Sequence, residues 1–541
     1  MLVDVLPKWE RMVYWIVGVI PIFGSLYCLY LEGQSNKRWL HPSDFQKNWR
    51  WLGHDQDQSD NEWSMWKSSL PWLILSNICH LSLSQACFFF SAKKKVRVFI
   101  LSVFDVAALA MFFGVWPVLL YLSKFLLMYI ISCTSCIPAV WLTAVIMTAT
   151  GINSTLLEWQ LRHFFLRNPD TPAHSFIVAS GFFDIHLVSF AIDKIKWEQT
   201  KYTDSKSMEL DPKRNQIPIY PEVSKEYLSP SQETSVTEDN RPCFMDFFFY
   251  TFYLPKFVHG PIYLFRAFYL DINAHFNAKE QTMDIRNICT NLLKILFWAL
   301  LLDFLLHFFY FSSLGSHPSV VKQLSLAAVC AMGYMQGQIF MVKYFCSYGL
   351  TGQLSRFDGV TPHPNPRCIS WVYSYTDMWK YFDCGLYKFI KTYIFIPFGG
   401  SQAGWFNHFR ASAVAFFFIF YWHGARINLF IWAAGNFLTG VVEKIAKCLE
   451  QSTPGVRLKS KLSAAMQLRL RVIFIVPLYV ISCWLIFCFF FDITTTWVII
   501  EKMILKASWT KILIENLIFI SVVHNAVYIS MLRRKRRAKS Q

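Results

Sequence analysis

Residues 472–491 read VIFIVPLYVISCWLIFCFFF, a run that contains no charged side chain. An α-helix rises 1.5 Å per residue, so about twenty apolar residues cross the roughly 30 Å hydrocarbon core of a bilayer. The run therefore predicts a membrane-spanning helix, and the search for similar runs decides the fold class.

Similar apolar runs recur along the chain and predict about ten to twelve helices that span the membrane or re-enter it, in an all-α polytopic fold. We expect one helical membrane unit over 1–541 rather than several soluble domains. The run at 411–421 is too short to span and is expected to be re-entrant or broken. The other clear runs lie at 13–31, 70–90, 98–115, 125–150, 175–192, 244–268, 292–311, 324–348, 429–442 and 512–532.

Composition agrees with a membrane protein and excludes two other classes. The chain is 54% hydrophobic and 16% charged, whereas soluble chains average about 25% charged. Its net charge of +17 comes from Lys and Arg beside apolar runs, which indicates membrane topology and no nucleic-acid partner. The 14 cysteines are scattered and indicate buried thiols, not a secreted disulfide framework.

Basic residues near the ends of three runs predict the orientation of the chain. They are Lys8 and Arg11, the segment 93–97 and the basic tail at 533–541, and all three are expected on the cytosolic side. This implies an even number of crossings, with 32–69 on the luminal side. The polar segment 194–242 is rich in Pro and Ser and is expected to be a flexible loop.

Two ionisable residues in apolar surroundings are candidate site residues. Asp383 lies in KYFDCGL and His423 ends the run FFFIFYWHG; an ionisable group at membrane depth suggests a functional site. Each also has a structural reading, since a histidine near a helix end can simply be satisfied there and Asp383 can cap a helix or pair with Lys380. Asp303 and His307 are expected to satisfy one another or helix ends.

The region 244–443 also contains motifs that are typical of a known family. Taken together they resemble the membrane-bound O-acyltransferase superfamily, and within it the hedgehog acyltransferases. One departure from the pattern is His259, which is not expected to touch the chemistry. The motifs are YLPKFVHGPI at 253–262, RFDGVTPHPNPRC at 356–368, MWKYFDCGLYKFI at 378–390, YIFIPFGGSQ at 393–402 and FYWHG at 420–424.

The resemblance assigns roles to individual residues. It implies that His423 is the active-site histidine, that Asp383 is the acidic residue accompanying it, and that Trp379 lines the acyl-CoA channel. It also implies that Cys368 can hold haem b as a thiolate. The catalytic core is expected at 244–443.

The function implied by the resemblance is transfer of palmitate from palmitoyl-CoA to the amine of the N-terminal cysteine of a hedgehog signalling domain. The enzyme would lie among membrane lipids of the endoplasmic reticulum or Golgi. A neutral His423 can take the proton of the acceptor amine, while Asp383 can orient that histidine, position the amine or polarise the thioester. Lys380, Lys388 and Lys391 are candidates to meet the anionic CoA headgroup.

Two alternatives remain at this point. The first is another acyltransferase of the same fold that acts on a Wnt serine or a lipid, although the stretch 366–383 favours the hedgehog branch. The second is a transporter or a non-catalytic membrane regulator. Transporters often carry inverted repeats, and no repeat is visible in the sequence.

Overall fold

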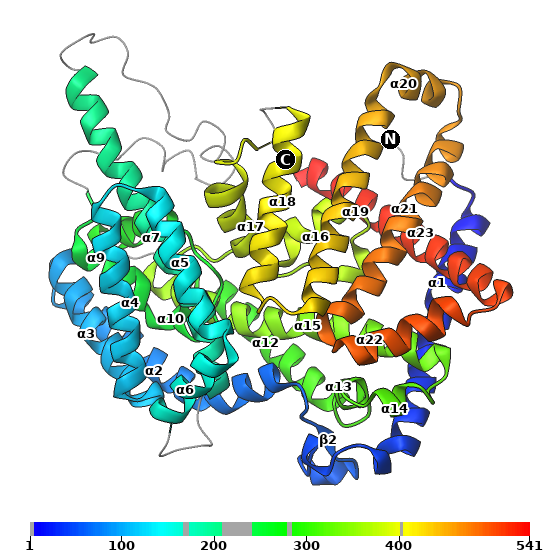
Figure 1. Ribbon diagram of the computed structural model, residues 1–541, viewed down its shortest axis with the longest axis horizontal. Helices are drawn as coiled ribbons and strands as arrows, with labels where there is room; N and C mark the ends of the chain where they lie inside the picture. The colour runs from blue at the N-terminus through cyan, green and yellow to red at the C-terminus, as the bar shows by residue number, and fades with distance from the viewer. Residues whose placement is uncertain (1–4, 166–172, 208–240, 279–283, 401–403, 541) are drawn as a thin grey trace.

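The computed structural model describes residues 5–165, 173–207, 241–278, 284–400 and 404–540, and most of them are helical (Figure 1). The described strands are β1 (Phe45–Gln46) and β2 (Gln56–Asp57), which pair antiparallel. The prediction of an all-α membrane fold is confirmed.

The N-terminal group of helices packs around one hydrophobic core, which fills the left half of Figure 1. Aromatic side chains dominate that core, and the long first helix lies apart from it, against the second half of the molecule. The helices of this part of the chain are α1 (Lys8–Asn36), α2 (Asn61–Phe89), α3 (Lys94–Phe113), α4 (Val115–Cys133), α5 (Ile137–Ile152), α6 (Ser154–Phe164), α7 (Ala173–Ser207), α9 (Phe244–Phe252), α10 (Leu254–Phe257) and α11 (Phe265–Asn277).

The second half forms the right side of Figure 1 and surrounds the long central helix α15. Its helices are α12 (Ile285–Leu305), α13 (Phe311–Gly315), α14 (Pro318–Val321), α15 (Leu326–Ser355), α16 (Tyr375–Phe382), α17 (Cys384–Ile390), α18 (Trp405–Trp422), α19 (Ile427–Gln451), α20 (Thr453–Ser460), α21 (Ala464–Phe490), α22 (Ile493–Ile500) and α23 (Trp509–Ser540).

Within the described ranges, nine helices are long and apolar enough to cross a membrane. The count becomes ten if α5 and α6, which meet at an angle of 73°, form one broken span. Helices α15 and α18 cover the runs at 324–348 and 411–421 but are not among the nine. Both helices contain polar residues, so α15 and α18 suit positions inside the protein better than positions in contact with lipid.

The apolar run at 125–150 is two helices rather than the single span expected. Helix α4 ends at Cys133 and α5 begins at Ile137, and Ser135 between them has a φ of 55°. Pro138 lies in the first turn of α5, where its missing N–H is tolerated, whereas a continuous helix would clash with its ring. The prediction overlooked this break because it weighed hydropathy alone.

The run at 244–268 is also broken, into α9, α10 and the start of α11. Pro255 and Pro261 lie at the two breaks. Between them, a Cβ on Gly260 would lie 2.5 Å from the Cα of Lys256, so the turn that presents His259 needs glycine at this position.

The expected loop at 194–242 is helical in its first part, because α7 continues to Ser207. An ion pair one turn apart, Lys194 Nζ to Glu198 Oε1 at 2.8 Å, supports this extension. Residues 208–240 make up most of the remaining segment that was predicted to be a loop, and they lie outside the described residues.

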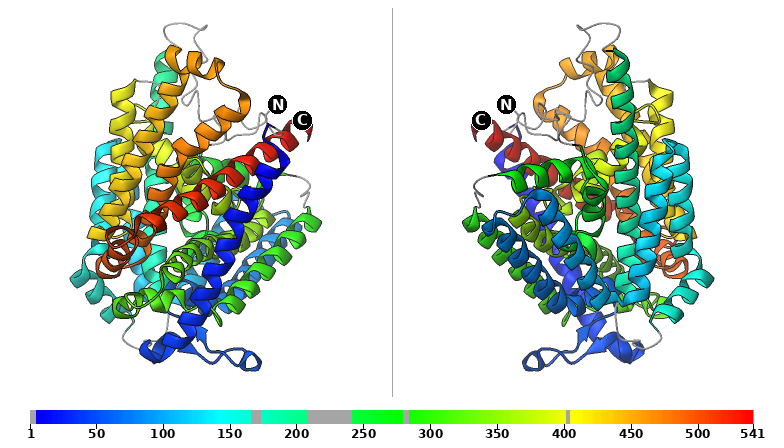
Figure 2. Two further views of the ribbon diagram at one scale, coloured as in Figure 1. Left: turned by 90° about the vertical axis from the view of Figure 1, so that its right-hand side faces the viewer. Right: turned by 90° about the vertical axis from the view of Figure 1, so that its left-hand side faces the viewer.

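Helices α1 and α23 pack antiparallel, so both ends of the chain lie at one end of the molecule (Figure 2). Asn525 Nδ2 donates to the Tyr14 carbonyl at 3.0 Å, and Arg11 donates to the Tyr528 hydroxyl at 3.0 Å. This arrangement agrees with an even number of crossings and with basic residues near both ends on one side.

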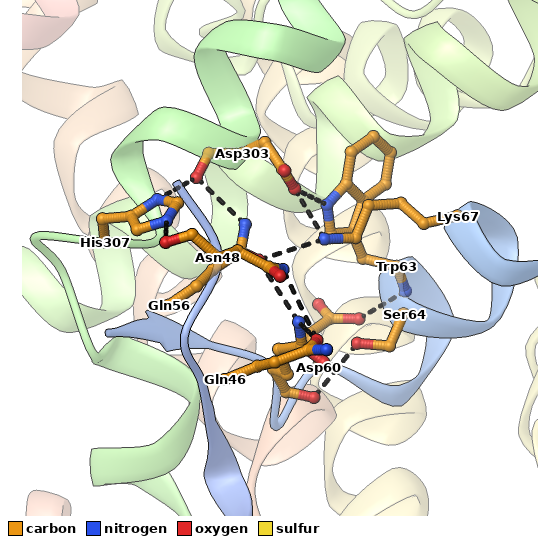
Figure 3. A network of polar contacts seen from close by, with 10 residues as sticks. Gln46, Asn48, Gln56, Asp60, Trp63, Ser64, Lys67, Asp303 and His307 are labelled. Carbon is orange, nitrogen blue, oxygen red and sulfur yellow. Dashed lines mark hydrogen bonds and ion pairs between the residues drawn. The ribbon is translucent and has the colours of Figure 1, made fainter. Parts of the chain in front are cut away.

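The loop that carries β1 and β2 lies at the opposite end and is tied down by a polar network (Figure 3). The Asp303 carboxylate accepts hydrogen bonds from Lys67 Nζ at 2.7 Å and Trp63 Nε1 at 3.2 Å. The backbone carbonyl of Asp303 accepts from Gln56 Nε2 at 3.1 Å, and the His307 ring lies 3.2 Å from the Asn48 carbonyl. These contacts join the loop to the start of α2 and the end of α12.

Candidate active site

A cavity of about 2380 Å³ runs through the second half of the molecule. Its lining comes mainly from α15, α16, α18, α19 and α21, with α1 and α23 closing one side. Four residues singled out in the sequence lie on this lining: Cys368, Trp379, Asp383 and His423. The fold thus brings these separate motifs to one space.

His423 caps the C-terminal end of α18, and its ring is held in one orientation. Its Nδ1 lies 2.7 Å from the Ile419 carbonyl oxygen; a carbonyl can only accept, so Nδ1 carries the proton and Nε2 of the neutral ring is an acceptor. The rings of Trp432 and Phe489 lie 5.5 and 5.4 Å away, centroid to centroid. Burial lowers the pKa of His423 below 6.5, so the ring is a neutral base near pH 7.

Asp383 forms the junction between α16 and α17. Its Oδ1 accepts from the Leu386 backbone N–H at 2.8 Å, which caps α17, and its Oδ2 accepts from the Tyr348 hydroxyl at 3.3 Å. Burial raises the pKa of Asp383, while the hydrogen bonds from Leu386 and Tyr348 oppose the rise. The carboxylate therefore combines a capping role with a place on the cavity lining.

Aromatic rings connect Trp379 to the histidine. Trp379 lies 5.6 Å from Trp432, and Trp432 lies 5.5 Å from His423, measured between ring centroids. Glu443 of α19 fixes the helix that carries Trp379, because it accepts from the Thr376 N–H at 2.9 Å at the start of α16. This wall suits a long apolar chain lying between Trp379 and His423.

The basic residues on the cavity differ from those expected. Of the three candidate lysines, Lys391 is on the lining, whereas Lys380 and Lys388 are not. The ammonium of Lys380 lies 5.6 Å from the Tyr381 ring, and that of Lys388 lies 3.3 Å from His363 Nδ1.

The end of the cavity beside α20 and α23 carries basic side chains, and the sequence predicted only Lys391 among them. Helix α20 and the end of α23 lie at the same end of the molecule as both chain termini (Figure 2). No motif marks the other three residues, and their common position depends on helix packing. We name this group the basic mouth, and it consists of Lys391, Lys444, Arg471 and Arg534.

Cys368 has a half-buried thiol on another part of the lining. Its Sγ lies 3.9 Å from Gln338 Oε1, and Tyr334, Gly337 and Trp371 line the cavity beside it.

Cys133 and Cys136 are exposed at the turn between α4 and α5. In the described part of the chain, no group of three or more His, Cys, Asp or Glu side chains is arranged to hold a metal ion.

A charged cluster beside Asp383 was also missed. Tyr344 and Tyr348 of α15 line the cavity, and Tyr344 donates to Glu62 Oε1 at 3.2 Å. Lys343 Nζ lies 2.9 Å from Glu62 Oε2. Charged residues at the edge of α2 and inside α15 were a usable signal, since such residues in apolar helices need partners.

The comparison with known families agrees with this site. The model of MBOAT, the membrane-bound O-acyltransferase family, matches residues 63–491, and the chain belongs to this family. The chain is accordingly an acyltransferase and a multi-pass membrane protein.

Three curated relatives narrow the comparison. The protein-cysteine N-palmitoyltransferase HHAT of Mus musculus is 28% identical over 84% of each chain. The protein-cysteine N-palmitoyltransferase Rasp of Drosophila melanogaster is 32% identical over 37% of this chain and 39% of its own length. The protein-cysteine N-palmitoyltransferase HHAT-like protein of Mus musculus is 22% identical over 83% of each chain.

Proposed function

We propose that this chain transfers palmitate from palmitoyl-CoA to the α-amine of the N-terminal cysteine of a hedgehog signalling protein. The observation that carries the proposal is a neutral histidine on the lining of one cavity, which also carries Asp383 and has the basic mouth at one end. The names of two relatives, both protein-cysteine N-palmitoyltransferases, support the choice of acceptor.

The geometry suits direct transfer without an acyl-enzyme. The acceptor amine attacks the thioester carbonyl, a C–N bond forms and the C–S bond breaks. His423 Nε2 takes a proton from the attacking nitrogen and returns it to the leaving CoA thiolate. In this scheme the Asp383 carboxylate, which lies on the same lining, binds the acceptor's terminal ammonium. It takes the first proton from that ammonium and releases it to solvent, which leaves the neutral amine that attacks.

The two substrates reach the site from opposite ends. The basic mouth faces the cytosol and attracts the phosphates of CoA. The aromatic wall from Trp379 to Trp432 takes the acyl chain. The luminal end receives the acceptor. We accordingly assign the catalytic core to 244–443 and the protein to the membrane of the endoplasmic reticulum or Golgi.

Haem b is a second proposed ligand, and the residues around Cys368 fit it. The thiol lies on the cavity lining beside the aromatic side chains of Tyr334 and Trp371. Cys368 would hold the haem through its thiolate. No step of the transfer depends on this group.

The proposal is tested with purified full-length protein, labelled palmitoyl-CoA and a peptide that begins with cysteine. Amide-linked label is expected on this peptide and not on the same peptide with an acetylated N-terminus. His423→Ala should lose transfer, and His163→Ala, on an exposed part of α6, should retain it. Label on a serine peptide or a lysolipid in place of the cysteine peptide would favour the alternative acyltransferase reading.

A further inference from the structure

Two tyrosines separate the cavity from a buried charged pair. Tyr344 and Tyr348 lie one turn apart on α15 with ring centroids 4.9 Å apart, and both line the cavity. Tyr348 donates to Asp383 at 3.3 Å, and Tyr344 donates to Glu62 at 3.2 Å. We call these two residues the tyrosine wall, because Glu62 lies behind it and is not on the cavity lining.

His259 lies behind the same wall. Its ring centroid is 5.5 Å from Tyr344 and 5.8 Å from Tyr348, and its Nε2 is 3.7 Å from Glu62 Oε1. The side chain is 3% exposed, and neither ring nitrogen has a hydrogen-bond partner among the described residues. A buried imidazole without partners is costly, and a proton on Nε2 would convert the contact with Glu62 into an ion pair.

The charges around this histidine do not balance. Lys343 Nζ lies 2.7 Å from Asp60 Oδ2 and 2.9 Å from Glu62 Oε2, so one ammonium serves two carboxylates, and Asp383 adds a third. Buried carboxylates need an equal number of positive partners. A proton on His259 and one ammonium group of a substrate would supply the two that are missing. The charged and titratable groups around His259 come from three elements, and the apolar Phe182 of α7 also packs on its ring. They are Asp60 and Glu62 at the start of α2, Lys343, Tyr344 and Tyr348 of α15, and Asp383 before α17. His423, on the cavity lining, is a further titratable group near Glu62.

We propose that His259 and Glu62 are positioning residues that act across the tyrosine wall on the charge of Asp383, and so set the pH range in which the site holds an acceptor's terminal ammonium. The inference rests on the proposed function, since it needs an amine acceptor that binds at Asp383. In this proposal His259 acts from behind the wall and does not itself touch the reacting groups.

The sign of the effect follows from the charges. A protonated His259 neutralises Glu62 and leaves Asp383 ionised, and an ionised Asp383 attracts an ammonium. In His259→Gln the only cation beside Glu62 among the described residues is the Lys343 ammonium that it shares with Asp60. The excess negative charge that remains makes Asp383 bind a proton more readily. Glu62→Gln in addition removes that excess charge, so the double variant is balanced again.

The test measures the affinity of full-length protein for a fluorescent peptide beginning with cysteine, from pH 5 to pH 7.5, without acyl-CoA. The peptide amine stays protonated over most of this range, since α-amines titrate near pH 7.7 to 8.0. The acid-side loss of affinity should move up by about one pH unit in His259→Gln, a tenfold weaker affinity at low pH. It should return to the wild-type position in the His259→Gln/Glu62→Gln double variant, and His163→Gln should not move it.

A merely structural role gives other results. Affinity that falls equally at every pH, or a double variant that is worse than the single one, overturns the proposal. If the single variant does not fold, the double variant must still match wild type, and a shifted profile there overturns the proposal as well. Wild-type protein that neither binds nor acylates the peptide contradicts the proposed function itself, which is a separate outcome.

Discussion

Two regions beside the cavity differ in charge. The basic mouth gathers Lys391, Lys444, Arg471 and Arg534 from helices near both chain termini. Asp383 lies on another part of the lining, and behind the tyrosine wall next to it is a cluster with more carboxylates than ammonium groups. The proposed anionic donor and cationic acceptor would therefore each be attracted to a different region, and the neutral His423 lies on the lining that the two regions share.

The largest expected effect concerns which compartment each end faces. A tag after the C-terminus should be reached by antibody once the plasma membrane alone is permeabilised, because the basic tail is expected in the cytosol. A tag inserted at Gly53, where a Cβ would meet nothing within 4 Å, should stay hidden until internal membranes are opened. A luminal C-terminus would reverse the assignment of the two ends.

His423→Ala should lower the transfer rate by roughly 10²- to 10⁴-fold, the usual contribution of a general base. The side chain is fixed by one hydrogen bond to Ile419 and lies on an open cavity, so expression and detergent stability should stay near wild type. Single-turnover transfer and thermal unfolding measure the two effects. A wild-type transfer rate would remove His423 from the mechanism.

Asp383→Asn should weaken transfer by about 10- to 100-fold, the scale of losing one charged hydrogen-bond partner. The asparagine oxygen can still cap α17 through Leu386, so the fold is retained while the charge is lost. The loss should appear mainly in the KM for the acceptor peptide. An Asn variant equal to wild type, beside an inactive bulky variant, would show that Asp383 acts through packing.

The double change Lys444→Gln/Arg471→Gln at the basic mouth should raise the KM for palmitoyl-CoA by about 3- to 10-fold, with kcat nearly unchanged. The effect should shrink at high salt, because screening weakens the wild-type attraction. Lys388→Gln is the matched control, since Lys388 contacts His363 away from the lining. A larger effect of Lys388→Gln would restore the prediction made from sequence.

Cys368→Ala should have the smallest effect on transfer. If haem b binds through this thiolate, the purified wild type shows the absorption of a thiolate-ligated haem and the variant loses it, while the transfer rate stays close to wild type. A spectrum that is unchanged in the variant, or absent from the wild type, rejects the ligand without affecting the acyltransferase assignment.

The sequence predicts the fold class well because hydropathy reports directly on burial in lipid. It fails where a short local feature outweighs the average hydropathy. Examples are Ser135 before α5 with Pro138 in its first turn, and Pro255 in the first turn of α10 with Gly260 after its end. The helical extension of α7 to Ser207 was missed for the opposite reason, since its polar composition resembles a loop.

Some residues of the candidate site could be predicted from the sequence, and others could not. His423 and Asp383 could be proposed because each lies in a motif of its own, and the structure places both on one lining. Glu62 and His259 could not be joined to Asp383 from sequence, because α2, the turn after α10 and the start of α17 meet only in the folded chain. Residue type was visible in the sequence, whereas contact between distant segments was not.

The antiparallel pairing of α1 with α23 has a consequence for biosynthesis. Helix α1 is made long before α23, whose Asn525 donates to the Tyr14 carbonyl. Until α23 is made, the side of the cavity that Phe519 closes next to Gly18 of α1 has no cover. A chain that stalls before α23 would keep an unsealed groove in the bilayer, which membrane quality control could recognise as an unfinished product.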